Sequence, residues 1–161
     1  ELGNFILGGG SLSSRLGNRV RQQEGLSYGI ASYALPRAKD NRVDFIVAAI
    51  TNPGKKDRLV AVINEELDKI RSVGITETEL EEAKKAYLQA ARVRRSDDAA
   101  LNQELLGSLF NERTMQLVAD HENNIANATV DGVNSAIRKY IDPEKLVIAV
   151  AGDFANNPPS E

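Results

Sequence analysis

The feature that most constrains this chain is a helix that turns directly into a strand. Apolar residues recur every four positions between residues 12 and 20, which predicts one buried helical stripe. Gly25 follows at the position where a helix stop needs a left-handed backbone, and apolar Leu26 stands behind it. From Tyr28 onward the sequence is rich in β-formers. We therefore expect a Schellman-type helix end that leads straight into a strand.

This turn separates two side chains that could bind a peptide. Arg21 carries a planar fork of five donors, and Tyr28 carries a neutral hydroxyl donor on a stiff arm. Together they could hold a peptide carbonyl, or an oxyanion that forms from it. Each also has a structural explanation: Arg21 would complement the helix dipole, and Tyr28 would pack on the sheet. For each residue taken alone the structural explanation is favoured, whereas the occurrence of both residues across one turn favours a role in peptide binding.

The motifs around the turn occur in a characteristic order. The sequence N-F-I-L-G-G-G spans residues 4–10, S-S-R-L spans 13–16, and K-L-V-I-A-V-A-G-D-F spans 145–154. Between them, Arg21, Gly25, Leu26 and Tyr28 match the pattern R-x-x-x-G-L-x-Y. This series resembles the C-terminal, non-zinc domain of bacterial members of the pitrilysin/insulinase (inverzincin) family of zinc metallopeptidases. The resemblance covers the chain from about residue 4 to 154.

The resemblance implies roles for the residues of the turn. Arg21 would grip the substrate backbone, and Tyr28 would stabilise the oxyanion formed from the scissile carbonyl. Gly25, Leu26 and Ser27 would belong to the substrate-binding turn. The partners would be an extended peptide substrate and an N-terminal zinc-binding domain, in the same protein or in a partner subunit. The chain would thus be half of a metalloendopeptidase, inactive in isolation.

The residue content of this chain is consistent with a zinc site in another domain. The family's H-x-x-E-H motif places two histidines on one helical face with a carboxylate as general base. This chain has one histidine, His121, and no cysteine, so neither a zinc ligand set nor a histidine-activated nucleophile can be assembled. We expect no metal or other cofactor in this chain, and we interpret His121 as a surface or helix-packing residue.

The order of predicted elements indicates an α+β fold. Residues 28–35 and 43–51 predict an antiparallel hairpin, several helices follow, and residues 146–151 predict a closing strand. We expect an antiparallel-dominated sheet with helices packed on one face, as in half-domains of the mitochondrial-processing-peptidase type. Residues 1–154 would form one such domain, N-terminally truncated and missing its upstream strand, and 155–161 would be a tail. The second hairpin strand is apolar on both faces, which predicts cover by helices or by a neighbouring domain.

Composition excludes several other classes of function. The net charge of −3 and the pI of about 5.3 provide no basic field for nucleic acid. No apolar run approaches the roughly 18 residues of a membrane span. The glycines at 8–10 fit neither phosphate-binding pattern, and a close backbone approach or a flexible link near a substrate groove explains them better. The exported long relatives of the resembled family favour a periplasmic over a cytoplasmic location.

Two other functions compete with a peptidase half-domain. A catalytically inactive family member could serve as a scaffold or as a peptide-binding partner subunit. The retained pair Arg21 and Tyr28 argues against that alternative without removing it. An α+β interaction module unrelated to peptidases is the third hypothesis, because a fold alone does not define a function.

Overall fold

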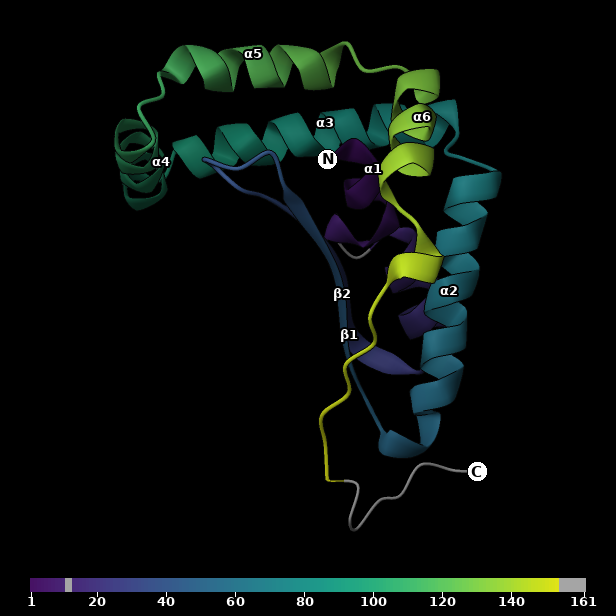
Figure 1. Ribbon diagram of the computed structural model, residues 1–161. Coiled ribbons are helices and arrows are strands. Elements are labelled where there is room, and N and C mark those ends of the chain that lie inside the picture. Colours follow the sequence, from purple (N-terminus) through teal and green to yellow (C-terminus); the bar gives the residue numbers. More distant parts are fainter. Residues whose placement is uncertain (11–12, 154–161) are drawn as a thin grey trace.

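A long, curved β-hairpin forms the spine of the molecule, and helices pack against one of its faces (Figure 1). The computed structural model describes residues 1–10 and 13–153. The elements in chain order are α1 (Leu2–Asn4), η1 (Phe5–Gly9), η2 (Gly17–Gln23), β1 (Ser27–Pro36), β2 (Val43–Thr51), η3 (Pro53–Lys55), α2 (Lys56–Ser72), α3 (Glu77–Arg95), α4 (Asp98–Phe110), α5 (Met115–Ala126), α6 (Val130–Tyr140) and η4 (Pro143–Lys145).

The hairpin matches the two strands predicted from the sequence. β1 and β2 pair antiparallel from Pro36 opposite Val43 to Ser27 opposite Thr51. Side chains alternate between the faces of a strand, and one face of each strand packs on the helices. That inner face carries Ile30, Phe45 and Val47. The opposite face stays exposed, so helices cover one face of the hairpin only.

The core lies between the hairpin, the N-terminal helices and α2, and residues of α3, α5 and α6 complete it. Leu7, Leu16 and Leu67 are completely buried in its larger cluster. Gly8 passes so close to β1 that an added Cβ would lie 2.7 Å from the hydroxyl oxygen and 2.9 Å from the main-chain nitrogen of Ser32. A close backbone approach, one of the two explanations that the sequence left open, therefore accounts for this glycine.

Two cap motifs delimit the long helices. Asn52 accepts a hydrogen bond from the backbone of Gly54 at the start of η3. Thr76 and Glu79 form a reciprocal capping box at the start of α3. Glu79 also receives two hydrogen bonds from Arg15, at 2.7 and 2.8 Å. This contact ties α3 to the N-terminal part of the chain and holds the pKa of Glu79 down at about 2.

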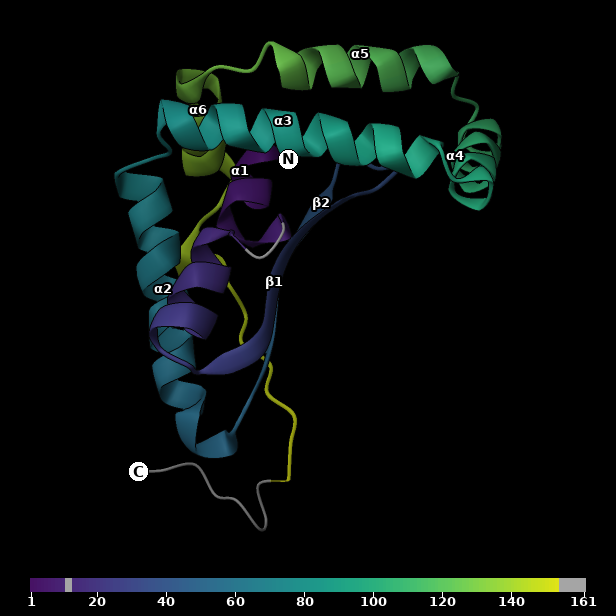
Figure 2. The ribbon, with the colours of Figure 1, turned by 180° about the vertical axis from the view of Figure 1, so that it is seen from behind.

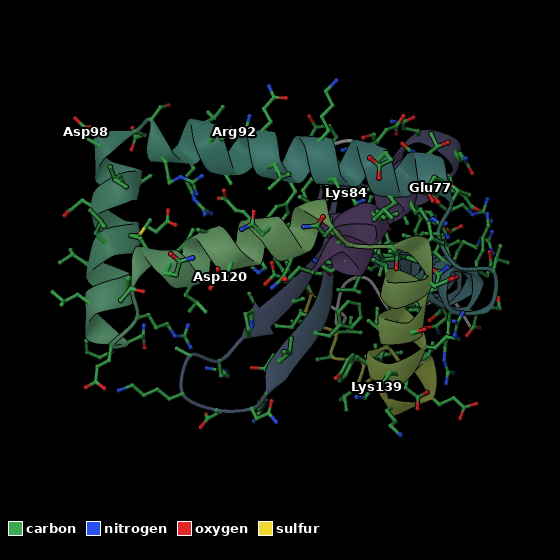
Figure 3. All side chains as sticks on the ribbon, turned by 90° about the horizontal axis from the view of Figure 1, so that it is seen from above. Glu77, Lys84, Arg92, Asp98, Asp120 and Lys139 are labelled. Atoms are coloured by element: carbon green, nitrogen blue, oxygen red, sulfur yellow. The ribbon has the colours of Figure 1, made fainter. Side chains whose placement is uncertain are left out.

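The helices α3, α4 and α5 extend beyond the hairpin. α3 and α5 lie side by side, and α4 crosses their ends (Figures 2 and 3). Tyr87 of α3 and His121 of α5 are joined at 3.2 Å, and His121 Nε2 also lies 2.9 Å from a carboxylate oxygen of Glu1. His121 is thus a helix-packing residue, as interpreted from the sequence.

The predicted closing strand is the main error of the sequence reading. Residues 146–151 follow η4, but within the described residues they form no ladder with another strand. A strand is stable only when a neighbour accepts and donates its main-chain hydrogen bonds. Leu146 packs against the core, whereas Val147 is 93% exposed. The upstream strand expected from the resemblance would supply such a neighbour, and it stays a prediction.

The fold class itself is confirmed. The described residues form an α+β unit with a two-stranded antiparallel sheet and helices on one face. Among them, no helix is both long enough and apolar enough to cross a membrane. The predicted tail, residues 155–161, lies outside the described part of the chain.

Candidate functional site

The turn between η2 and β1 has the conformation that its sequence predicted. Gly25 adopts a left-handed backbone with φ of +57°, which an L side chain resists. The amide of Leu26 donates to the carbonyl of Val20 at 2.9 Å. This bond resembles that of a Schellman stop but spans one residue more, because η2 is a π-helix. Leu26 then inserts beside Val20, Leu59 and Val62 in the smaller core cluster.

Side chains from neighbouring elements clamp the main chain of the turn. Lys55 Nζ donates to the carbonyl of Gly25 at 3.0 Å, and Thr51 Oγ1 donates to the carbonyl of Leu26 at 2.5 Å. In the other direction, the hydroxyl of Ser27 in the turn itself donates to the carbonyl oxygen of Ile50 at 2.5 Å. These contacts come from β2 and η3, so the turn is fixed by residues far along the chain.

An ion network holds the same turn on its outer side. Arg58 of α2 donates to both carboxylate oxygens of Glu24, at 2.9 and 2.5 Å. Arg58 also pairs with Glu65, and Arg19 bridges Glu24 and Glu65 at 2.9 and 3.0 Å. The hydrogen bond from Arg58 is the main reason that the pKa of Glu24 lies below its usual range. The hydrogen bonds from Arg19 and Arg58 likewise lower the pKa of Glu65.

Tyr28 occupies a β-bulge directly after this turn. Ser27 pairs with Thr51 and Gly29 pairs with Ile50, so Tyr28 is the extra residue on β1. A bulge redirects a side chain, and bulges are common beside active sites. The Tyr28 side chain is 93% exposed, which rules out the structural explanation that it packs on the sheet. The fold presents this phenol to solvent from a clamped backbone.

Arg21 lies in the last turn of η2 and is partly buried. Its position complements the negative end of the helix, so the structural explanation for this arginine remains valid. That explanation is compatible with a role toward a ligand, because a guanidinium has five donors. Arg21 and Tyr28 stand on the two sides of the same hydrogen-bonded turn.

The other three residues predicted at the site are placed differently from one another. Gly25 is exposed, and a Cβ added to it would meet nothing within 4 Å. Leu26 and Ser27 are buried at 8% and 6% exposure. A ligand at this turn would meet Gly25 and Tyr28, whereas the side chains of Leu26 and Ser27 hold the turn in place.

Sequence reasoning missed the residues that clamp the turn. Lys55, Arg58 and Thr51 are 23 or more positions away from it in the chain, and no local pattern links them to it. The bulge was missed as well, because it depends on the register between two strands. Only the capping and turn signals at Gly25 could be read locally.

The described residues do not fit a metal ion. No group of three or more histidine, cysteine, aspartate or glutamate side chains within residues 1–10 and 13–153 could hold one. Zinc hydrolysis requires three protein ligands and an open position. No catalytic step through a metal can be derived from this part of the chain.

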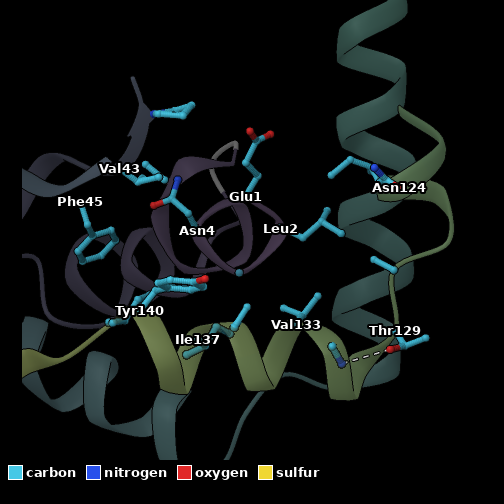
Figure 4. Close-up of a pocket in the computed structure, with 18 of the residues that line it drawn as sticks. Glu1, Leu2, Asn4, Val43, Phe45, Asn124, Thr129, Val133, Ile137 and Tyr140 are labelled. Atoms are coloured by element: carbon cyan, nitrogen blue, oxygen red, sulfur yellow. Dashed lines mark hydrogen bonds between the residues drawn. The ribbon is translucent and has the colours of Figure 1, made fainter. Parts of the chain in front are cut away.

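A concave region lies between the N-terminal helix, the hairpin and α6 (Figure 4). It is a cavity of about 720 Å³ with a mainly apolar lining that includes Phe45, Val133 and Ile137. Its walls come from α1, α5, α6 and the part of the hairpin near its tip, and none of the residues 21–28 lines it, so it is separate from the turn that carries Tyr28. A lining of this kind can take an apolar group, but it offers no nucleophile with a base.

Comparison with known proteins identifies the family of this fold. A family model described as the inactive domain of M16 peptidases matches residues 1–87. None of the curated proteins matches the chain.

Several solved structures share the fold. The M16 inactive domain of Pseudomonas fluorescens superposes with a TM-score of 0.76 and 26% identity, over 89% of this chain and 34% of that one. The inactive peptidase domain of a candidate zinc protease from Bordetella parapertussis superposes with a TM-score of 0.72 and 20% identity, over 88% of this chain and 75% of that one. A protease from Helicobacter pylori superposes with a TM-score of 0.71 and 17% identity, over 88% of this chain and 34% of that one. The last two likenesses show the fold alone.

This chain spans about a third of the Pseudomonas protein and three quarters of the Bordetella one. The family model covers more than half of the 161 residues, and the matched region contains the whole turn with Arg21 and Tyr28. The resemblance read from the sequence is thereby confirmed. The chain belongs to the M16 peptidase family and corresponds to the inactive, non-zinc domain of that family.

Proposed function

We propose that this chain is the substrate-binding half of a zinc metalloendopeptidase whose zinc and general base reside in another domain. Arg21 grips the main chain of an extended peptide, and the Tyr28 hydroxyl donates a hydrogen bond to the oxyanion formed from the scissile carbonyl. The observation that carries the proposal is the placement of Tyr28: a phenol 93% exposed, on a bulge, beside a turn clamped by Lys55, Arg58 and Thr51.

Clamping matters because oxyanion stabilisation depends on preorganisation. A donor that already points at the developing charge needs no reorganisation during the reaction, and loss of one such donor typically lowers turnover by ~10²–10³. A phenol is suited to this role, since it donates while remaining neutral. The backbone beside Tyr28 is held at Gly25, Leu26 and Ser27 by hydrogen bonds from or to other elements. In this proposal those three residues support the position of the phenol.

The test uses the complete zinc peptidase, meaning this chain together with its zinc domain, in one polypeptide or as a partner subunit. Tyr28→Phe removes only the hydroxyl, so we expect kcat to fall ~10²–10³-fold with little change in KM. Arg21→Gln removes the fork that binds the ground state as well, and we expect mainly a rise in KM. Tyr140→Phe, at an exposed tyrosine of α6, is the matched control.

The same experiment separates the proposal from the scaffold alternative. A scaffold or peptide-holding subunit contributes no donor to the transition state, so Tyr28→Phe would leave kcat unchanged. Family membership removes the third hypothesis of an unrelated interaction module. An unchanged kcat in Tyr28→Phe would therefore favour a catalytically inactive supporting role for this chain.

A further inference from the structure

The face of the hairpin that points away from the helices is apolar although it is exposed. It carries a strip of six residues, three from each strand, which we call the apolar strip: Gly29, Ala31 and Tyr33 of β1, and Ile46, Ala48 and Ile50 of β2. Tyr33 is 47% exposed, Ile46 is 45% exposed and Ile50 is 84% exposed. Charged and polar side chains are usual on the solvent face of an antiparallel sheet, so this apolar strip is a candidate contact surface.

The pairing of β1 with β2 determines where large and small side chains lie on the apolar strip. Ala31 lies directly opposite Ala48, so two methyl groups face each other across the strands. On one side of this pair, Tyr33 lies opposite Ile46, and on the other side Ile50 lies opposite Gly29. Large side chains thus flank two small ones on the same face. A bulky apolar side chain could rest on the alanines, between Tyr33 and Ile50.

The apolar strip is continuous with the proposed site. Tyr28 immediately precedes Gly29, and Gly29 is paired with the highly exposed Ile50. From Gly29 to Tyr33 the strand rises about 14 Å, the length of about four residues of an extended peptide. At its other end the strip reaches Asp44, which Arg37 and Arg42 hold at 2.6 and 2.7 Å. A peptide anchored at Tyr28 can therefore run along apolar surface until it meets these charges.

The size of the apolar strip favours a single extended chain over a folded partner. Two strands about 4.8 Å apart and 14 Å long cover on the order of 150 Å² of sheet surface. A stable protein–protein interface needs about 800 Å² on each partner. One peptide segment with one or two large apolar side chains matches the smaller area.

We propose that the apolar strip is a specificity site that receives a large apolar side chain, such as leucine or phenylalanine, of the peptide held by Arg21 and Tyr28. This inference rests on the proposed function, because it takes the peptide to be anchored at the turn. Ala31 and Ala48 leave the space for the side chain, and Tyr33, Ile46 and Ile50 provide its apolar contacts. Substrates with a small or charged residue at that position lose these contacts.

Filling the space above the alanines tests the proposal. Ala48→Leu and Ala31→Leu add bulk on the exposed face of the hairpin, away from the core. The probes are short, internally quenched peptides that differ at one residue, which is leucine, phenylalanine, alanine or serine. In the complete zinc peptidase we expect each variant to lower kcat/KM for the leucine and phenylalanine peptides about 10-fold, through KM. The alanine and serine peptides should be cleaved as by the parent protein.

Ala99→Leu is the control, since Ala99 is an exposed alanine of α4, outside the hairpin. Binding of the labelled leucine and alanine peptides, followed by fluorescence anisotropy, gives a readout independent of turnover. In this binding assay the alanine variants should likewise lose the preference for the leucine peptide over the alanine peptide. No change in preference for either alanine variant, in cleavage and in binding, would overturn the proposal.

Three other combinations of results are also decisive. A uniform loss of activity toward all peptides, with weaker association of the domains by size-exclusion chromatography, would show that the apolar strip contacts a protein partner and would refute the peptide site. If preference changes as expected but Tyr28→Phe leaves kcat intact, the strip stands and the oxyanion role falls. If Tyr28→Phe lowers kcat but the alanine variants are silent, the proposed function survives and the specificity site does not.

Discussion

Replacing Gly25 with alanine isolates the backbone strain on which the candidate site depends. Gly25 has φ of +57°, and a Cβ added there would meet nothing within 4 Å. The substitution therefore introduces no clash, and its cost is that of a left-handed L-residue, about 1–2 kcal/mol. For a chain of this length each kcal/mol lowers the melting temperature by about 2–4 °C, so we expect a decrease of about 2–8 °C.

Thermal unfolding followed by far-UV circular dichroism measures this effect, and two further variants sharpen it. Gly25→Asn should be less destabilising than Gly25→Ala, because asparagine tolerates the left-handed region. Gly107→Ala is the matched control: it makes the same chemical change in the interior of α4, where the added Cβ also meets nothing. There alanine should stabilise by about 0.5–1 kcal/mol.

Opposite signs at the two glycines would establish that the left-handed turn is required. If Gly25→Ala is as stable as the parent protein, or if asparagine is worse than alanine at this position, the turn is not held as described. In the complete zinc peptidase, Gly25→Ala should also lower kcat, since a shifted turn displaces Tyr28.

Three further predictions concern contacts of the same framework. Glu79→Gln keeps the capping acceptor but removes the charge paired with Arg15; the lowered pKa of Glu79 means that this stabilisation is complete above about pH 4.5 and is lost as the pH falls toward 2. We expect the variant to lose about 1 kcal/mol of unfolding free energy at neutral pH, less than the roughly 3 kcal/mol that the full pKa shift corresponds to, because the pair is partly screened by solvent. Measured from pH 7 down to pH 2, the unfolding free energy should depend less on pH in the variant than in the parent protein. Gly8→Ala should destabilise by about 1–3 kcal/mol in urea unfolding, since its Cβ would press on the main chain of β1. Lys55→Met removes the donor to the Gly25 carbonyl and should increase amide exchange at the turn, whereas Lys85→Met, at an exposed lysine of α3, should not.

The parts of the fold that were predictable are those set by neighbouring residues. Gly25 with Leu26 marked a helix stop, and Thr76 with Glu79 marked a helix start, because both signals act within one helical turn. The hairpin was readable from alternation of apolar residues. Its exposed outer face was not, since the sequence shows two apolar faces without showing which of them is covered.

The features that were missed depend on contacts distant in the chain. The bulge at Tyr28 follows from how β1 and β2 align, and the clamp by Lys55 and Arg58 follows from how α2 packs on the turn. The closing strand was predicted from its β-rich residues and from the family resemblance of residues 145–154. Leu146 does pack on the core, but a ladder partner is a property of the whole sheet.

The most direct test of the central claim is the affinity of a transition-state mimic. A phosphinic peptide presents a tetrahedral oxyanion, so it should lose ~10²–10³-fold in affinity when Tyr28→Phe is introduced into the complete zinc peptidase. The corresponding unmodified peptide, measured with the zinc removed, should bind the variant and the parent protein equally. Equal losses for both ligands, or no loss for the phosphinic peptide, would contradict the assignment of Tyr28 to the oxyanion.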